Sequence, residues 1–124
     1  MEKNLLDYTA GKVDEMLVAG SAAPETKKAA QDWKDAIAAG KDANEATNKL
    51  LDSISEHQTT VDSMLAFLNT ETAKKIMGED GVAQMVKHET ARKDAGARFC
   101  DCAACKPCHE LLTKFGREEA DVYL

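Results

Sequence analysis

The sequence contains few aromatic residues and few prolines, and it has no cysteine outside one short segment near its end. Aromatic residues make up 5% of the 124 residues and hydrophobic residues 44%, so a core must consist mainly of aliphatic side chains. Two prolines leave room for long helices, and Ala, Glu, Lys and Leu, which favour helices, dominate the composition. A chain of this length fits a single domain, residues 1–124, with a core that needs no disulfides.

Positive charge and long apolar runs are also scarce. The formal net charge is −6, whereas nucleic-acid binding needs clustered Lys and Arg to neutralise phosphates. No segment approaches the roughly 18 apolar residues of a membrane span, and the start of the chain lacks the basic and apolar pattern of a signal peptide. We therefore expect a cytoplasmic protein that binds neither nucleic acid nor membranes, in a compartment where thiols stay reduced.

The spacing of the apolar residues predicts helices throughout, and no alternating pattern indicates a strand. The expected helices cover about 3–19, 24–40, 42–69, 70–78, 81–97 and 107–116. The longest is predicted from an apolar stripe between Leu50 and Leu68, and His57 on that stripe is expected to be a hydrogen-bonded core residue. Trp33 is expected to anchor the core. The predicted fold is all-α, a four- or five-helix bundle with a cysteine-rich loop before the last helix.

The four cysteines, Cys100, Cys102, Cys105 and Cys108, fall within nine residues and are followed by His109. The segment contains one Cys-x-Cys and two Cys-x-x-Cys spacings, and Cys-x-x-Cys can bring two sulfurs to one ion. Thiolates are soft ligands that favour zinc, copper(I) or iron–sulfur clusters. The start of a helix at Pro107 would further favour the thiolate form. This pattern indicates a metal or thiol site.

The spacing of the cysteines leaves the ligand set of the metal open. One short loop is sterically awkward for four tetrahedral ligands, so three thiolates with a fourth donor are easier, from His109, His57 or a second chain. An iron–sulfur cluster tolerates close cysteines, although the spacing is not that of a ferredoxin. Cys105 and Cys108 could instead form a redox pair. Cys108 also suits a small buried residue, because the apolar pair Leu111 and Leu112 follows it.

The run CKPCH at 105–109, near the end of a helical chain of this length, resembles the haem-attachment site of cytochromes c′. In that family the two cysteines form thioethers with haem and the histidine is the axial iron ligand. The resemblance implies haem binding through Cys105, Cys108 and His109. It assigns no role to Cys100 or Cys102.

A second resemblance extends over most of the chain, through LDY at 6–8, ETKKAAQDW at 25–33 and AGARFCDCAAC at 95–105. These segments are similar to small helical proteins of anaerobic bacteria that share the signature Gly-Ala-x-aromatic-Cys-Asp-Cys-x-Ala-Cys. Such proteins often carry the label of a ninety-kilodalton heat-shock molecular chaperone. The chain is far too short for that chaperone's ATPase domain and has no Gly-rich nucleotide loop. The resemblance implies that Cys100, Cys102 and Cys105 are the central positions.

The leading hypothesis is a small, non-catalytic metal-binding protein that holds zinc or an iron–sulfur centre with Cys100, Cys102 and Cys105, joined by Cys108 or His109. No catalytic residue is predicted. The Glu-x-x-His pair of di-iron bundles is absent at every histidine. The alternatives are a thiol-redox or haem-binding electron-transfer protein, and an interaction module that forms a homodimer through the cysteine loop.

Overall fold

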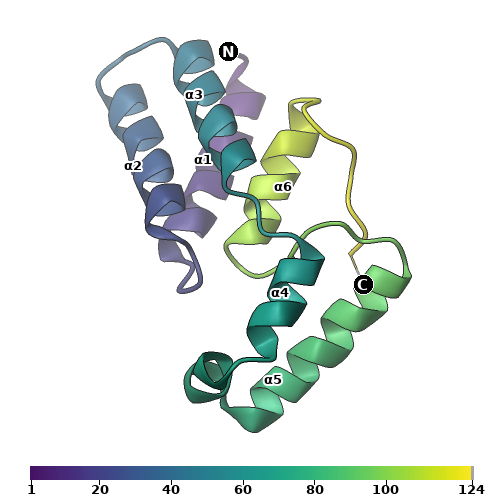
Figure 1. Ribbon diagram of the computed structural model, residues 1–124. Coiled ribbons are helices and arrows are strands. Elements are labelled where there is room, and N and C mark those ends of the chain that lie inside the picture. The colour runs from purple at the N-terminus through teal and green to yellow at the C-terminus, as the bar shows by residue number, and fades with distance from the viewer. Residues whose placement is uncertain (124) are drawn as a thin grey trace. The chain divides into compact units, whose positions relative to one another are not determined.

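The computed structural model describes residues 1–123, and over this range the chain forms six α-helices (Figure 1). They are α1 (Lys3–Val18), α2 (Pro24–Ala38), α3 (Ala43–Glu56), α4 (Val61–Leu68), α5 (Glu71–Asp94) and α6 (Cys105–Lys114). The described residues contain no strand, only an isolated antiparallel bridge between Thr60 and Phe99. The predicted all-α class with a cysteine-rich stretch before the last helix is confirmed. None of the described helices is both long and apolar enough to cross a membrane.

The contacts divide the chain into two compact units. The first unit consists of residues 1–58 and 101–120, and the second consists of residues 59–100 with the C-terminal residues from Asp121. The first unit therefore contains α1, α2, α3 and α6, whereas the second contains α4 and α5.

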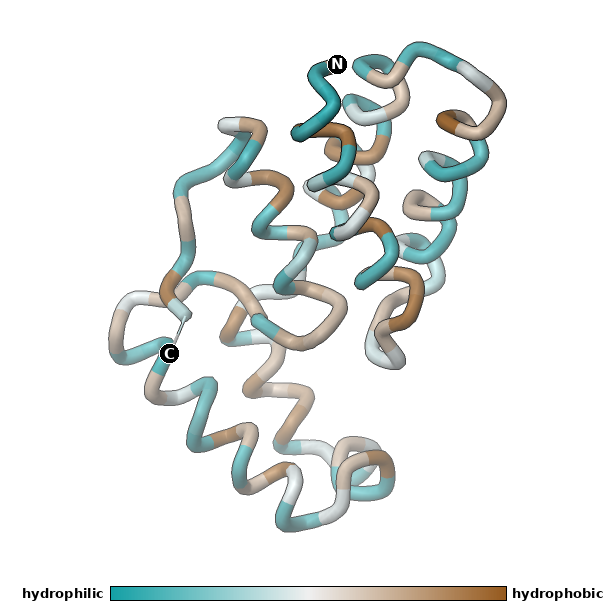
Figure 2. The backbone as a smooth tube through the Cα atoms, turned by 180° about the vertical axis from the view of Figure 1, so that it is seen from behind, coloured by the Kyte–Doolittle hydropathy of each residue, from teal (hydrophilic) through white to brown (hydrophobic). Residues whose placement is uncertain are grey.

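The first unit is held together by an apolar core in which α1 packs on α2 and α6, and α3 on α2 and α6. Apolar residues recur along these helices between hydrophilic ones, as Figure 2 shows in brown and teal. Trp33 is 3% exposed and its indole N–H donates to the Thr47 hydroxyl over 3.0 Å, so its expected role as a core anchor is confirmed. The buried core residues are Val13, Met16, Ala30, Trp33, Ala46, Leu50, Leu51, Ile54, Cys108, Leu111 and Leu112.

The single long helix predicted over 42–69 is wrong, because α3 ends at Glu56 and α4 begins only at Val61. Thr60 caps α4, its hydroxyl oxygen accepting the N–H of Ser63 over 3.0 Å. His57 ends α3 and is exposed, with Nδ1 2.8 Å from the Ser53 carbonyl oxygen, so its predicted core position is also wrong. The apolar spacing continues across this break because its first half, with Leu50 and Ile54, packs in the core of the first unit. Its second half, with Leu68, packs in the core of the second unit.

In the second unit, α4 and α5 pack against each other around a small core of Leu68, Ala73 and Val82. Gly78, where the sequence predicted a helix to end, has φ of 76° and interrupts α5 with a kink. Only glycine adopts this conformation readily, which explains why the break falls there. Beyond the kink, α5 also buries the charged residues Glu89 and Arg92 completely.

Candidate metal centre

The structure brings together three of the four predicted thiols. The sulfur atoms of Cys100, Cys102 and Cys105 all lie within 4.8 Å of one another on six consecutive residues. All four cysteines are present as thiols and not as disulfides. A tetrahedral zinc ion with Zn–S bonds of about 2.3 Å holds its sulfurs about 3.8 Å apart. Small side-chain adjustments would therefore bring the three sulfurs onto one ion.

Each of these cysteines is placed by a different local feature. Cys100 is 1% exposed and follows Phe99 of the isolated bridge, and its N–H donates to the Thr59 carbonyl over 2.9 Å. Cys105 is the first residue of α6, which begins two residues earlier than Pro107, the predicted start. Cys102 lies in the turn between them, and its carbonyl accepts the Lys106 N–H over 2.9 Å. The turn and the helix start therefore direct closely spaced sulfurs to one place.

A serine from the loop between α1 and α2 contacts the site from far along the chain. The Ser21 hydroxyl donates to the sulfur of Cys102 over 3.4 Å. A donor to sulfur stabilises the thiolate, the form that binds metals. The sequence carries no signal for this contact, because an isolated serine 81 residues away resembles any other loop serine.

Cys108 lies outside this group and forms part of the core of the first unit. Its side chain is buried and donates its S–H to the Ala104 carbonyl over 3.2 Å. Burial, with a smaller contribution from the charge of Cys102, raises the pKa of the Cys108 thiol to about 12. The thiol is therefore protonated at neutral pH, so Cys108 is a poor metal ligand and a poor redox nucleophile as it stands.

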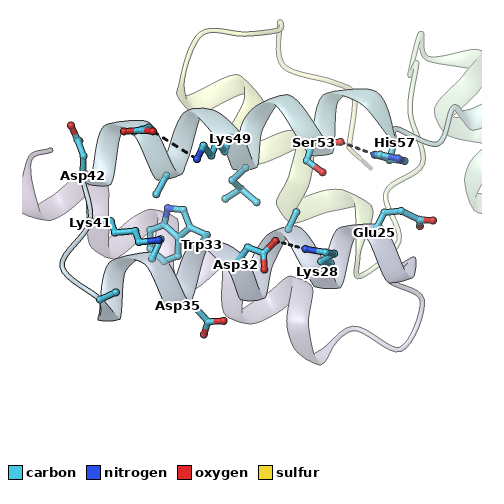
Figure 3. Close-up of a pocket in the computed structure, with 16 residues that line it drawn as sticks. Glu25, Lys28, Asp32, Trp33, Asp35, Lys41, Asp42, Lys49, Ser53 and His57 are labelled. Carbon is cyan, nitrogen blue, oxygen red and sulfur yellow. Dashed lines mark hydrogen bonds and ion pairs between the residues drawn. The ribbon is translucent and has the colours of Figure 1, made fainter.

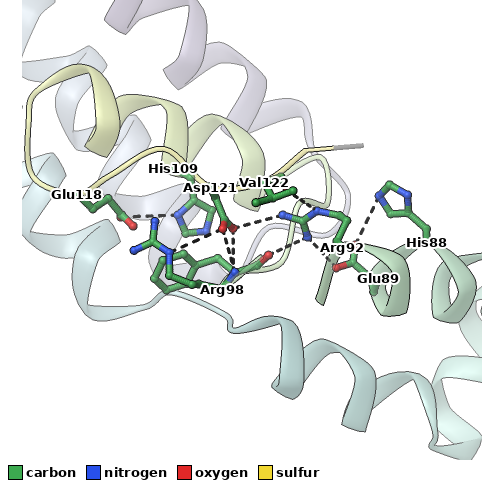
Figure 4. Close-up of polar contacts among 9 residues, drawn as sticks. His88, Glu89, Arg92, Arg98, His109, Glu118, Asp121 and Val122 are labelled. Atoms are coloured by element: carbon green, nitrogen blue, oxygen red, sulfur yellow. Dashed lines mark hydrogen bonds and ion pairs between the residues drawn. The ribbon is translucent and has the colours of Figure 1, made fainter. Parts of the chain in front are cut away.

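His109 also lies outside the group of three thiols. Its side chain is 2% exposed, and Nδ1 lies 3.7 Å from the Glu118 carboxylate. Figure 4 marks this contact with a dashed line. His57 is likewise not part of the group. Neither histidine that the sequence offered as a fourth donor has a ligand atom among the three sulfurs.

A groove in the first unit has a volume of about 1020 Å³ and lies between α2 and α3 (Figure 3). Its lining carries charges of both signs, among them the paired Lys28 and Asp32, whose atoms approach to 2.8 Å. No group of metal-ligating side chains found among the described residues lies in it. The thiol cluster therefore carries the more specific chemistry.

No protein-family model, no curated protein and no solved structure matches the chain. The resemblances to Cys-Asp-Cys proteins and to the cytochrome c′ haem site stay predictions. The geometry of the thiol site is therefore the observation from which a function can be inferred.

Proposed function

We propose that this protein binds a soft metal, as a zinc ion or an iron–sulfur centre, through Cys100, Cys102 and Cys105. The observation that carries the proposal is the proximity of the three sulfurs, within 4.8 Å of one another. An all-sulfur set of this kind favours soft or borderline metals over magnesium and calcium, which prefer oxygen. We also propose a cytoplasmic location, because such thiols would persist there in reduced form.

Three thiolates leave one position of a tetrahedral ion for another donor. Water, a side chain that moves, or a ligand from a second copy of the chain would each complete the coordination. Metal-dependent dimerisation is therefore part of the proposal. Size-exclusion chromatography with and without zinc would test it, and an unchanged elution volume would rule out the second copy.

The burial of Cys108 supports a metal site over the alternative redox pair of Cys105 and Cys108. A reversible disulfide needs both sulfurs to become accessible thiolates in turn, and the pKa of Cys108, raised to about 12 by burial, opposes this. Haem attachment at 105–109 would require the same buried sulfur to form a thioether. Both alternatives therefore need α6 to repack, whereas the group of three thiols needs only side-chain adjustment.

Elemental analysis and an absorption spectrum of protein purified without oxygen would test the proposal. We expect about one zinc ion per chain, or iron with sulfide and broad visible absorption. The Cys100→Ser, Cys102→Ser and Cys105→Ser variants should each lose the metal. Cys108→Ala is the matched control, since it removes a thiol from the same segment outside the group, and it should retain the metal.

Several results would contradict the proposal. Protein that stays free of metal after purification and after titration with zinc would exclude it, above all if Cys105 and Cys108 oxidised reversibly. Metal loss in Cys108→Ala equal to that in Cys100→Ser would show that the ligand set is wrong. A Soret band would establish haem in place of zinc.

A further inference from the structure

The segment that leads into Cys100 is held in place by hydrogen bonds at successive backbone groups. The Arg98 carbonyl accepts the Val61 N–H over 3.0 Å, and the Cys100 N–H donates to Thr59 over 2.9 Å. Between these groups, the Phe99 carbonyl accepts from the Arg92 guanidinium over 2.8 Å. These contacts lie within the second unit, so this unit determines where the backbone of Cys100 lies.

The remaining backbone donors of this segment bind the carboxylate of Asp121, close to the C-terminus. The N–H groups of Arg98 and Phe99 donate to its two oxygens over 2.9 and 3.0 Å. Arg92 approaches the same carboxylate with Nη2 over 3.3 Å (Figure 4). Asp121 thus accepts hydrogen bonds from the backbone N–H groups of both residues that precede Cys100.

Arg92 is the centre of this network, and its side chain is fully buried. Nη1 donates to Glu89 over 2.8 Å as well as to Phe99, and Nε donates to the Val122 carbonyl over 2.9 Å. A buried guanidinium between two buried carboxylates has a large desolvation cost, and apolar side chains of similar size often stabilise a fold equally well. Stability alone therefore gives no reason for placing such a network directly before Cys100.

We infer that Asp121 and Arg92 are positioning residues for the proposed metal site, and that they hold Cys100 where its sulfur meets those of Cys102 and Cys105. This inference depends on the proposed metal-binding function. Groups that orient metal ligands through hydrogen bonds typically change metal affinity 10- to 100-fold when they are removed. The C-terminal residues would therefore contribute to metal affinity without supplying a ligand.

The test compares Asp121→Ala with Leu68→Ala in the full chain. Asp121→Ala removes both acceptors of the 98–99 N–H groups but leaves the buried Arg92 paired with Glu89, so no isolated buried charge results. Leu68→Ala opens a cavity in the same unit and removes none of the hydrogen bonds that hold residues 98–100. It is the matched control for a general loss of stability.

The measurements are the affinity for Zn²⁺, by competition with a chromophoric chelator, and the spectrum of Co²⁺ bound in its place. We expect Asp121→Ala to weaken zinc binding at least about tenfold and to change the Co²⁺–thiolate bands. Asp121→Asn, which retains one acceptor oxygen, should lie between this variant and the wild type. Leu68→Ala should keep the wild-type affinity and spectrum.

Unchanged zinc affinity and Co²⁺ spectrum in Asp121→Ala would overturn the inference and leave the proposed function intact. An equal loss in Leu68→Ala would also overturn it, because the effect would then follow stability and not position. Failure of the wild-type protein itself to bind Zn²⁺ or Co²⁺ would instead refute the proposed function, together with the inference that depends on it.

Discussion

The two units of this protein are stabilised by different kinds of contact. The first unit surrounds its apolar core with four helices, and its buried anchors include Trp33, Leu50 and Leu111. The hydrophobic cluster of the second unit contains the buried residues Leu68, Ala73 and Val82, and the unit also buries Glu89, Arg92 and the Asp121 carboxylate. Apolar packing tolerates substitution of similar volume, whereas a buried charge network depends on every member. The second unit should therefore be the more sensitive to single polar substitutions.

The largest effect should come from Arg92→Met, which leaves two buried carboxylates without their shared cation. We expect a loss of about 3–5 kcal/mol of unfolding free energy in the second unit. Urea titrations can separate the units, because Trp33, the only tryptophan, lies in the first and circular dichroism reports on both. Helical signal should be lost before the fluorescence of Trp33 changes. Coincident transitions, both shifted, would show that the units unfold as one domain.

Leu50→Ala should produce the converse result in the first unit. Leu50 is 2% exposed, and truncating a buried leucine costs about 2–5 kcal/mol, towards the lower end where neighbours can collapse into the cavity. The fluorescence transition of Trp33 should move to lower urea. Zinc affinity, measured at urea concentrations well below that transition, should stay close to the wild-type value. A large decrease in zinc affinity would indicate that the first unit orients the site more than expected.

For Asp121→Asn we expect a smaller loss of unfolding free energy that depends on pH. Burial alone would raise the pKa of this carboxyl, but the N–H groups of Arg98, Phe99 and Val122 and the charge of Arg92 outweigh it and lower the pKa below its ordinary value of 3.8. A carboxyl whose pKa is lowered in the folded state stabilises the fold at pH values above its ordinary pKa. This stabilisation is lost as the pH falls through the pKa that the carboxyl has in the folded state.

The wild type should therefore exceed Asp121→Asn by about 2 kcal/mol between pH 5 and 7. The difference should shrink as the pH falls below about 4. Arg92 and Arg98 face the same carboxylate, and Glu89 pairs with Arg92. All three residues are present in both proteins, so the difference between urea titrations at each pH reports the contribution of the Asp121 carboxyl. A difference that stays constant down to pH 2 would contradict the assigned direction of the shift.

The smallest effect concerns the reactivity of Cys108. Because burial raises the pKa of its thiol to about 12, iodoacetamide at pH 8 should leave Cys108 unmodified in the metal-free folded protein. The half-buried Cys102 and Cys105 should react first. Mass spectrometry of the digested protein gives the extent of alkylation at each cysteine. Rapid modification of Cys108 would mean that α6 opens and would revive the redox and haem alternatives.

The sequence by itself determined the helical class, several helix ends and the location of the chemistry. Gly78 ends a helical run because a positive φ suits only glycine, and the apolar spacing around Trp33 places it in a core. Such local signals depend on near neighbours, so they can be read from the chain. The close spacing of Cys100, Cys102 and Cys105 likewise predicted that their sulfurs would meet.

Only the tertiary structure decided how the long apolar stripe divides and which residues support the thiols. The apolar spacing does not change at the break between α3 and α4, because the residues before the break pack in one core and those after it in another. The burial of Cys108 and the contacts of Cys102 with Ser21 and of Phe99 with Asp121 join residues brought together by folding. Hydrogen bonds of this kind depend on distances in space, and the spacing of residues along the chain does not encode them.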